Sequence, residues 1–253
     1  MNGATAGNAG PELPGVNTLP VCYTSLTPLV PQRHGSMRYR RTTGFAFAGG
    51  VNAVPALAEE FANAQNTCPI VFTRGNQPKP VLLLGMTSGR NDHVGPDGAW
   101  PPGQHVPAFL RRYPFMLVRE SSASSRMILC ADLAADGFSE TEGEPLFEAD
   151  AATDTMKRIL NFCERYEQAS LRTDALVAEL ASLDLFQDAS VSIRTGGGTK
   201  KIDGFRTVSE DRFKALDDAK LADFARRGII GLLAAHWASI QQFQDIVPGM
   251  ASA

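Results

Sequence analysis

The sequence predicts an α+β fold, with a mostly antiparallel sheet in its first half and helices from its second half packed on that sheet. Short apolar runs bounded by Gly, Pro, Ser or charged residues recur between positions 69 and 131, a pattern typical of buried strands. From Thr153 onward, apolar residues instead recur every three or four positions, as on the buried face of a helix. Strands followed by helices favour an α+β fold over an alternating α/β fold. We expect one globular domain over residues 21–253, preceded by a disordered, Gly- and Ala-rich tail of residues 1–20.

Length and composition are those of an ordinary globular protein. The 253 residues are enough to bury a large core, and 43% hydrophobic and 20% charged residues are usual values. The net charge of −3 indicates no basic face, so we expect no nucleic-acid partner. No apolar run approaches the roughly 18 residues of a membrane helix, and the N-terminus lacks the features of a Sec signal. We therefore expect a cytoplasmic protein without a membrane span, and leave open a surface association by another route.

The four cysteines are far apart in the sequence and form neither a Cys-x-x-Cys motif nor a zinc-type spacing with histidine. They are Cys22, Cys68, Cys130 and Cys163. Each is predicted to be a small buried hydrophobic residue in a reducing compartment. Disulfide pairing stays open, because connectivity is not readable from sequence.

In the first half, alternating aromatic and small residues at Gly44–Gly49 predict a strand or extended segment. Val51–Gln65 is predicted to be a helix, since Pro55 suits a first turn. The apolar runs predict four strands of one sheet: residues 69–73, 81–85, 115–118 and 127–131. Residues 74–79 and 120–126 read as the hairpin loops that join these strands in pairs.

In the second half, a helix is predicted from Thr153 through about Cys163, and a second one over about Thr173–Leu183, with Thr173 as its N-cap. Residues 190–194 and 202–208 predict a hairpin around a Gly-rich turn. The last two helices are expected at residues 217–227 and 229–243, separated at Gly228. The final helix carries a continuous apolar stripe, which we expect to be buried.

The stretch Gly85–Phe115 is a long irregular loop between predicted strands, and such loops are usually functional when they are ordered. His93 and His105 flank Asp97 within it. Two imidazoles and a carboxylate could form a non-haem iron or zinc site with open coordination positions, which makes these three residues candidate metal ligands. Their spacing matches no ligand motif, however, and the alternative is that the histidines are surface hydrogen-bonding groups.

Motifs for nucleophilic catalysis and nucleotide binding are missing from the sequence. Thr195–Lys201 is Gly-rich but lacks the Gly-Lys-Ser/Thr step of a P-loop, so it is predicted to be a hairpin turn. No Gly-x-Ser-x-Gly, Ser-x-x-Lys, His-Glu-x-x-His or Gly-x-Gly-x-x-Gly motif is present. His236 lies on the apolar stripe of the final helix and is predicted to be a hydrogen-bonded core histidine. A catalytic role for His236 is the alternative, because imidazole titrates near neutrality.

The short motif Arg111-Arg112-Tyr113-Pro114-Phe115 carries the most concentrated chemistry. Pro107 can start a short helix and Pro114 would end it. Consecutive helical residues point about 100° apart, so at most one arginine is expected to face a given partner. We favour an ion pair from an arginine to Asp132 or Glu142, with the aromatic rings in the core. The alternative is bidentate recognition of a carboxylate or phosphate on a partner.

Taken together, these landmarks resemble the SapC family over about Leu29–Phe243. The landmarks are Gly44–Ala48, Pro69–Phe72, Asn91, Asp97–Trp100, Val106–Ala108, Arg111–Phe115, Gly143, Leu146–Phe147, Gly204–Phe205 and Ala235–His236. The resemblance implies a bacterial surface-layer-associated protein, with no established reaction, no catalytic residues and no cofactor. Two positions depart from the usual pattern: His105 stands where relatives tend to have Tyr or Phe, and Trp237 where they tend to have Leu.

Two hypotheses about function follow from the sequence. The first is a non-enzymatic accessory or binding protein of a surface-layer or modification system, with a protein partner and with homo-oligomerisation left open. Its binding residues would be those of the loop and the motif after it, namely Asn91, Trp100, Arg111, Arg112 and Tyr113. The alternative is a metal-dependent enzyme, with non-haem iron or zinc, that modifies a peptide or small molecule in a pocket of the 91–113 loop.

Overall fold

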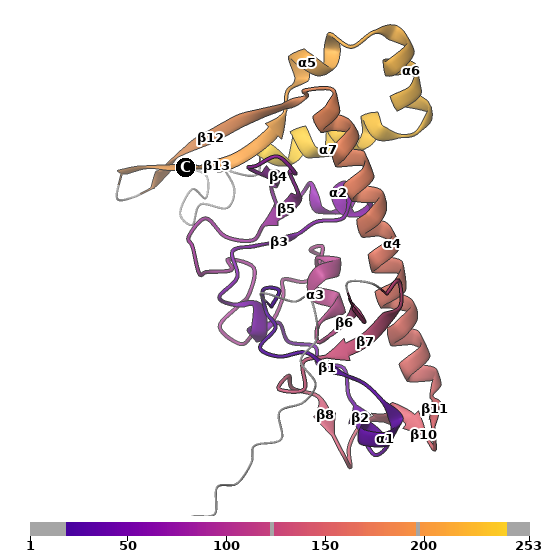
Figure 1. The fold of residues 1–253 in the computed structure, drawn as a ribbon. Coiled ribbons are helices and arrows are strands. Elements are labelled where there is room, and N and C mark those ends of the chain that lie inside the picture. The colour runs from indigo at the N-terminus through magenta and orange to yellow at the C-terminus, as the bar shows by residue number, and fades with distance from the viewer. Residues whose placement is uncertain (1–18, 122–123, 196–197, 242–253) are drawn as a thin grey trace, which may run out of the picture. The chain divides into compact units, whose positions relative to one another are not determined.

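The computed structural model describes residues 19–121, 124–195 and 198–241 (Figure 1). Antiparallel sheets and helices occur together, which confirms the predicted α+β class. The chain forms two compact units. Unit 1 combines the residues up to Thr42 with Arg112–Glu164, and unit 2 combines Thr43–Arg111 with the residues from Arg165 onward. The expected single domain over residues 21–253 stays a prediction, and most of the predicted tail lies outside the described residues.

Three small antiparallel sheets form unit 1. The first has the strand order β1 (Thr27–Pro28), β7 (Met127–Ala131), β6 (Phe115–Arg119). The second has the order β8 (Phe138–Ser139), β2 (Arg38–Tyr39), β9 (Glu144–Pro145), and the third pairs β10 (Phe147–Glu148) with β11 (Ala151–Ala152). A short helix, α1 (Pro31–His34), precedes β2. As predicted, β6 and β7 form a hairpin, with Leu117 opposite Leu129.

The core of unit 1 joins these sheets to the first part of the long helix α4 (Asp154–Ser182). Its fully buried residues include Leu146, Ala131 and Cys163. Aromatic packing is edge-to-face, with the rings of Tyr39 and Phe115 4.8 Å apart. This core buries the apolar face of the β6–β7 hairpin at Phe115, Leu117, Leu129 and Ala131.

Helix α4 is continuous, so the prediction of two separate helices in this region was wrong. Thr173 was expected to cap a second helix, but its hydroxyl donates to the carbonyl of Ala169, one turn earlier, at 2.8 Å. The same hydroxyl accepts the backbone N–H of Ala58 at 2.9 Å, which satisfies it inside the helix. No Gly or Pro interrupts the segment, so the helix runs through.

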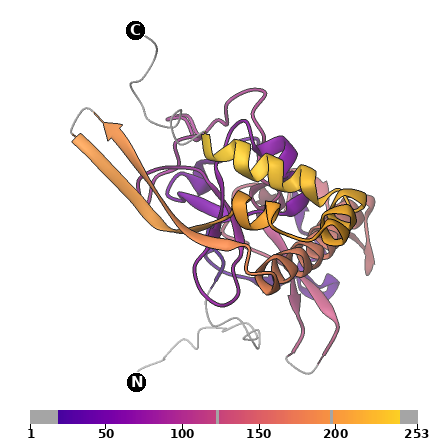
Figure 2. The same ribbon diagram turned by 90° about the horizontal axis from the view of Figure 1, so that it is seen from above.

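Unit 2 is built on a five-stranded antiparallel sheet with the strand order β12, β13, β4, β5, β3. Its strands are β3 (Ala53–Pro55), β4 (Ile70–Thr73), β5 (Pro80–Leu83), β12 (Phe186–Thr195) and β13 (Gly198–Val208). The four strands predicted for one sheet are therefore split, two in each unit, because each pair is a local hairpin separated from the other by the 85–114 stretch. The predicted second-half hairpin joins β4 through Phe205 and Arg206, and its outer part extends past the sheet (Figure 2).

Two predictions around residues 44–65 were wrong. Gly44–Gly49 contains a 3-10 helix, η1 (Ala46–Ala48), rather than a strand. Val51–Gln65 is not one helix, since it contains β3, the 3-10 helix η2 (Ala58–Glu60) and the short helix α2 (Phe61–Ala64). The physical reason is that Pro55 pairs with Val81 in the sheet, so the backbone there is extended.

Two helices of the last quarter, α6 (Asp218–Arg226) and α7 (Ile229–Ile240), lie where helices were predicted. A further short helix, α5 (Glu210–Lys214), was not predicted. Asp217 caps α6 by accepting the backbone N–H of Lys220 at 2.8 Å, and Gly228 separates α6 from α7 with a positive φ of 74°. Helix α7 buries Ile229, Leu233 and His236, as expected, although Phe243 lies outside the described residues. Among the helices that the structure describes, none combines the length and apolar character needed to cross a membrane.

Candidate functional site

The 85–113 loop, most of which belongs to unit 2, is held in place by Asn91. Its backbone N–H donates to Gly49, and its side-chain amide donates to the carbonyl of Ala48 at 3.2 Å. Its side-chain oxygen accepts the backbone N–H of His93 at 2.9 Å. Asn91 is buried, so these bonds explain the residue as an anchor of the loop. Its binding role stays a prediction.

His93 and Trp100 stack face to face, with ring centroids 5.1 Å apart and an angle of 11° between the planes. The Trp100 ring also meets Phe45 edge-on at 5.4 Å. Trp100 is 9% exposed, and within the described residues its indole N–H has no hydrogen-bond partner. A binding role for Trp100 stays a prediction, while its observed contacts are those of a loop anchor.

One row of side chains has the order of a catalytic triad, with a nucleophile, a base and a group that orients the base. Its members are Cys68, His93 and Gln104. Gln104 Oε1 lies 2.9 Å from His93 Nδ1, and His93 Nε2 lies 3.6 Å from Cys68 Sγ. Because a carbonyl oxygen only accepts, Nδ1 carries the proton and Nε2 faces the thiol. Cys68 is fully buried, however, and burial raises the pKa of its thiol to about 12. A buried neutral thiol is a poor nucleophile, so this alignment is best explained as packing of the loop.

His105 contacts Glu60 rather than the other metal-ligand candidates. Its Nε2 lies 2.9 Å from Glu60 Oε1, and the same oxygen accepts the backbone N–H of Ala108 at 2.6 Å. The second oxygen of Glu60 accepts the backbone N–H of Leu57 at 3.2 Å. Glu60 is 4% exposed, and it therefore ties the start of α3 (Ala108–Arg112) to η2.

Asp97 is occupied within its own turn. Its side chain accepts the backbone N–H of Ala99 at 3.0 Å, next to Gly98, which has a positive φ of 76°. His93, Asp97 and His105 thus have separate partners. Among the described residues, no group of three His, Cys, Asp or Glu side chains is placed to hold a metal ion. The metal site stays a prediction. To bind one metal ion together, His93, Asp97 and His105 would have to leave the partners described above.

The two arginines after this loop have different environments. Arg111 is exposed and its Nε donates to the carbonyl of Val106 at 3.0 Å, whereas Arg112 is 5% exposed. Tyr113, in unit 1, packs edge-to-face on Tyr23 with ring centroids 5.2 Å apart. Burial, followed by the nearby Asp132 carboxylate, raises the pKa of Tyr113 to about 12.

The two carboxylates proposed as arginine partners are held by other groups. Asp132 accepts hydrogen bonds from the backbone N–H of Thr24, the hydroxyls of Thr24 and Ser25, and the backbone N–H of Ala134. Glu142 forms an exposed ion pair with Arg40 at 3.5 Å. The role of Asp132 is to fasten the segment before β1 to the end of β7.

His236 is a core histidine, as predicted. It is fully buried, with Nδ1 2.8 Å from the carbonyl of Ile70 and Nε2 3.1 Å from the backbone nitrogen of Val208. Both ring nitrogens are engaged by backbone groups of β4 and β13. Burial lowers the pKa of His236 to about 4, which keeps the imidazole neutral. Its candidacy as a catalytic residue gains no support from these contacts.

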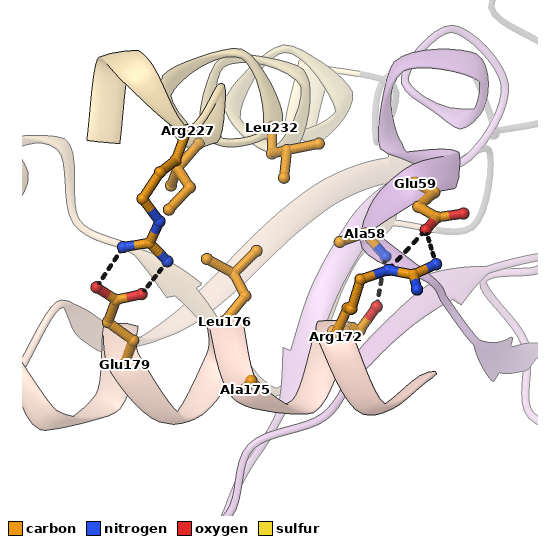
Figure 3. Close-up of a pocket in the computed structure, with 10 residues that line it drawn as sticks. Ala58, Glu59, Arg172, Ala175, Leu176, Glu179, Arg227 and Leu232 are labelled. Atoms are coloured by element: carbon orange, nitrogen blue, oxygen red, sulfur yellow. Dashed lines mark hydrogen bonds and ion pairs between the residues drawn. The ribbon is translucent and has the colours of Figure 1, made fainter. Parts of the chain in front are cut away.

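A groove in unit 2 is the surface feature that the sequence reasoning missed. It has a volume of about 440 Å³, within the range typical of ligand sites, and lies between η2, α4 and α7 (Figure 3). Its middle is apolar, and the lining residues there include Ala58, Ala175, Leu176 and Leu232.

Ion pairs close the groove at both ends, as Figure 3 shows. At one end Arg227 of the α6–α7 junction meets Glu179 of α4, with two N–O distances of 2.7 and 2.9 Å. At the other end Arg172 of α4 binds Glu59 of η2, with its Nε 3.1 Å from the carboxylate. The pairs bridge opposite walls, so an ion pair bounds each end of the groove, while the groove is open to solvent between them.

Glu179 is the most strongly perturbed carboxylate of the groove. It accepts from Arg227 and also from Lys220, whose Nζ lies 2.6 Å away. The hydrogen bond from Arg227 comes first among the causes that lower the pKa of Glu179 to about 2. A pattern in the sequence could have indicated this wall, since Arg172 and Glu179 are seven residues apart and share one helix face with Leu176 between them.

The fold and the groove define an α+β protein with a small apolar groove that has an ion pair at each end. The SapC family model matches residues 29–246, and the chain therefore belongs to the SapC family. Comparisons with curated proteins and with solved structures found no match.

Proposed function

We propose that this SapC-family chain is a non-enzymatic binding protein that recognises a protein partner and acts as an accessory to a bacterial surface-layer or modification system. Two observations support the proposal. The candidate catalytic groups have structural partners, such as Ile70 and Val208 for His236 and Glu60 for His105. The groove of unit 2 supplies an apolar pit of ligand size. A cytoplasmic location and the surface-layer association remain predictions.

The groove carries the proposal because its geometry defines what it can accept. Its apolar middle lies between Leu176 and Leu232, and its two ends are bridged by Arg227–Glu179 and Arg172–Glu59 (Figure 3). The ion pairs at the two ends limit the length of a partner segment that the groove accepts. One large apolar side chain of a partner segment could enter it, in the way that single anchor residues fill pockets at interfaces. Polar groups on either side of that anchor would then meet the ion pairs.

The exposure of the loop residues expected to bind a partner fits a structural role better than direct contact with that partner. Asn91, Trp100 and Arg112 are buried, and Arg111 is the exposed member of the set. We therefore assign the principal contact to the groove, and keep Arg111 as a residue at which a second contact would be measurable.

A display library of random peptides, selected on the immobilised full chain, tests this function. We expect enriched peptides to share one large apolar residue flanked by charged residues. Binding should be lost in Leu232→Glu, which places a carboxylate in the pit, and kept in Ile230→Glu, an exposed position of the same helix that does not line the groove. Thermal melts of both variants control for folding. Peptides that bind Leu232→Glu as well as the wild type would rule out the groove as the site.

A further inference from the structure

The five-stranded sheet of unit 2 has apolar side chains on both of its faces. On the first face, Ile70 lies opposite Leu82, and both residues are fully buried together with Phe72. The centroid of the Phe72 ring lies 6.5 Å from that of Phe61 in α2 and 5.2 Å from that of His236 in α7. Helices α2 and α7 therefore cover the first face.

The second face carries the side chains that alternate with these along the strands. Val71 of β4 lies opposite Val81 of β5, and Phe205 of β13 lies opposite Thr73 and Ala189. The residues of this face pack into one hydrophobic cluster, whose members from the sheet are Val71, Val81, Leu83, Ala189, Val191, Ile202 and Phe205. An apolar surface thus runs across β5, β4, β13 and β12.

The second face is covered less completely than the first. Among the residues that the structure describes, Met86 and Ile240 are the hydrophobic residues outside the sheet that pack against this cluster. Val71 and Phe205 are buried, but the other members from the sheet are only partly buried. An apolar surface of this extent is rarely left accessible to solvent. Ile240 is the last residue of α7, so the chain leaves this helix at the border of the second face.

The sequence after α7 has the length and the composition that a cover for this face needs. Residues 242–250 read QFQDIVPGM, in which Phe243, Ile246, Val247 and Met250 are apolar and Asp245 is the only charged residue. Nine extended residues reach at most about 30 Å. The four strands of the face span roughly 14 Å from the first to the last. The match to the SapC family extends to residue 246, so the family domain continues past the end of α7.

We propose that residues 242–250 of this chain cover the second face of the sheet, with their apolar side chains against the cluster around Val71 and Phe205. The occupant is this segment because it is tethered at Ile240, which already packs against the cluster. A short tether gives an effective concentration in the millimolar range, which favours the chain's own segment over a free partner. The segment acts as a strap that closes this face to other proteins. The cluster shares no residue with the groove, so the strap does not depend on the function proposed above.

Thiol labelling of the full chain at position 83 tests the strap. Leu83→Cys places a thiol on the second face, and we expect it to react slowly with a maleimide. Adding Phe243→Asp with Ile246→Asp should raise this rate about tenfold or more, because buried carboxylates without partners are unfavourable and the strap would detach. Adding Gln242→Asp with Gln244→Asp introduces the same charge at polar positions of the segment, and should leave the rate unchanged.

Two other thiols serve as references, and peptide mass analysis assigns the label to each position. Cys68 is fully buried and should stay unreactive in every variant, which shows that the fold is kept. Ile230→Cys, on the exposed side of α7, should react at the same rate in all variants. Val81→Cys, on the same strand and face, repeats the measurement if Leu83→Cys does not fold. Equal rates at position 83 with all three segments would overturn the proposal. A fast wild-type rate that falls as the protein concentration rises would also overturn it, and would assign the face to a second copy.

Discussion

His236 connects two strands through one ring: Nδ1 lies 2.8 Å from the carbonyl of Ile70 in β4, and Nε2 lies 3.1 Å from the backbone nitrogen of Val208 at the end of β13. Nε2 must accept from the Val208 N–H, so the proton is on Nδ1 and the ring is neutral. The histidine therefore satisfies two backbone groups that would otherwise be buried without partners.

Acidification should destabilise the protein through His236. The pKa of its imidazole falls from 6.5 to about 4 in the folded state, so the unfolded chain binds the proton more readily. This contribution to the free energy of unfolding is complete above about pH 6.5 and is lost as the pH falls toward 4, with a total of about 3 kcal/mol. Urea unfolding of the wild type and of His236→Gln at several pH values measures it. Equal pH dependence of the two proteins between pH 6.5 and 4 would contradict the assignment.

Leu233 should be essential for the packing of α7. The side chain is 1% exposed on the face that the helix buries. Leu233→Ala should lower the free energy of unfolding by about 2–5 kcal/mol, the usual cost of deleting a buried leucine side chain. Ile230→Ala on the exposed side of the same helix is the matched control, with an effect expected within about 0.5 kcal/mol. Similar losses in the two variants would mean that α7 is not packed by this face.

Asp132 should stabilise unit 1 through its four hydrogen-bonding groups. Burial alone would raise the pKa of this carboxyl, but the hydrogen bonds from Thr24, Ser25 and Ala134 hold it below its usual value. Its contribution is therefore present above the ordinary carboxyl pKa and is lost as the pH falls below it. Asp132→Asn should cost about 1–3 kcal/mol, because the amide presents N–H to donors that need an acceptor. Asp136→Asn, at an exposed position, serves as control in the same chemical denaturation experiment.

The sequence was most informative where structure is decided locally. The runs at β4, β5, β6 and β7 are bounded by Gly, Pro or charged residues, and their hairpins formed as predicted. The prediction failed where a tertiary partner decided the outcome. Pro55 could begin a helix, but its pairing with Val81 keeps it in the sheet. Thr173 could cap a helix, but its hydroxyl finds partners inside α4.

The candidate site was less predictable for the same reason. The residues that His93 and His105 contact, Cys68 and Glu60, are distant from them in the sequence. The groove combines residues near positions 58, 176 and 230, and no motif or spacing joins these segments. Among the residues of the groove, only Arg172 and Glu179, which are seven residues apart on α4, form a pattern that can be read from the sequence.

Metal content separates the binding function from the enzymatic alternative. The contacts of His93 with Cys68 and Gln104, and of His105 with Glu60, predict that purified protein contains far less than one equivalent of iron or zinc. Adding either metal should leave the melting temperature unchanged, because we expect neither metal to bind. A metal that did bind the native state would raise the melting temperature. Elemental analysis of the wild type and His93→Ala measures the content. A stoichiometric metal that disappears in His93→Ala would favour the enzyme.

Glu179, at one end of the groove, should stabilise the folded protein in a way that depends on pH. Its pKa of about 2, lowered first by the hydrogen bond from Arg227, lies below the value of 4.5 expected for a free glutamate. The stabilisation is therefore full above about pH 4.5 and declines as the pH falls toward 2. Glu179→Gln should cost roughly 1 kcal/mol at neutral pH, since the pair is partly exposed and screened by solvent. The loss should shrink at high salt, which weakens exposed ion pairs.

Glu210→Gln, whose exposed ion pair with Lys214 lies within one helix, is the control in the same salt and pH series. If Glu179→Gln and Glu210→Gln lose the same stability at every salt concentration, Glu179 contributes no more than an ordinary surface pair, and the groove end is not held by it.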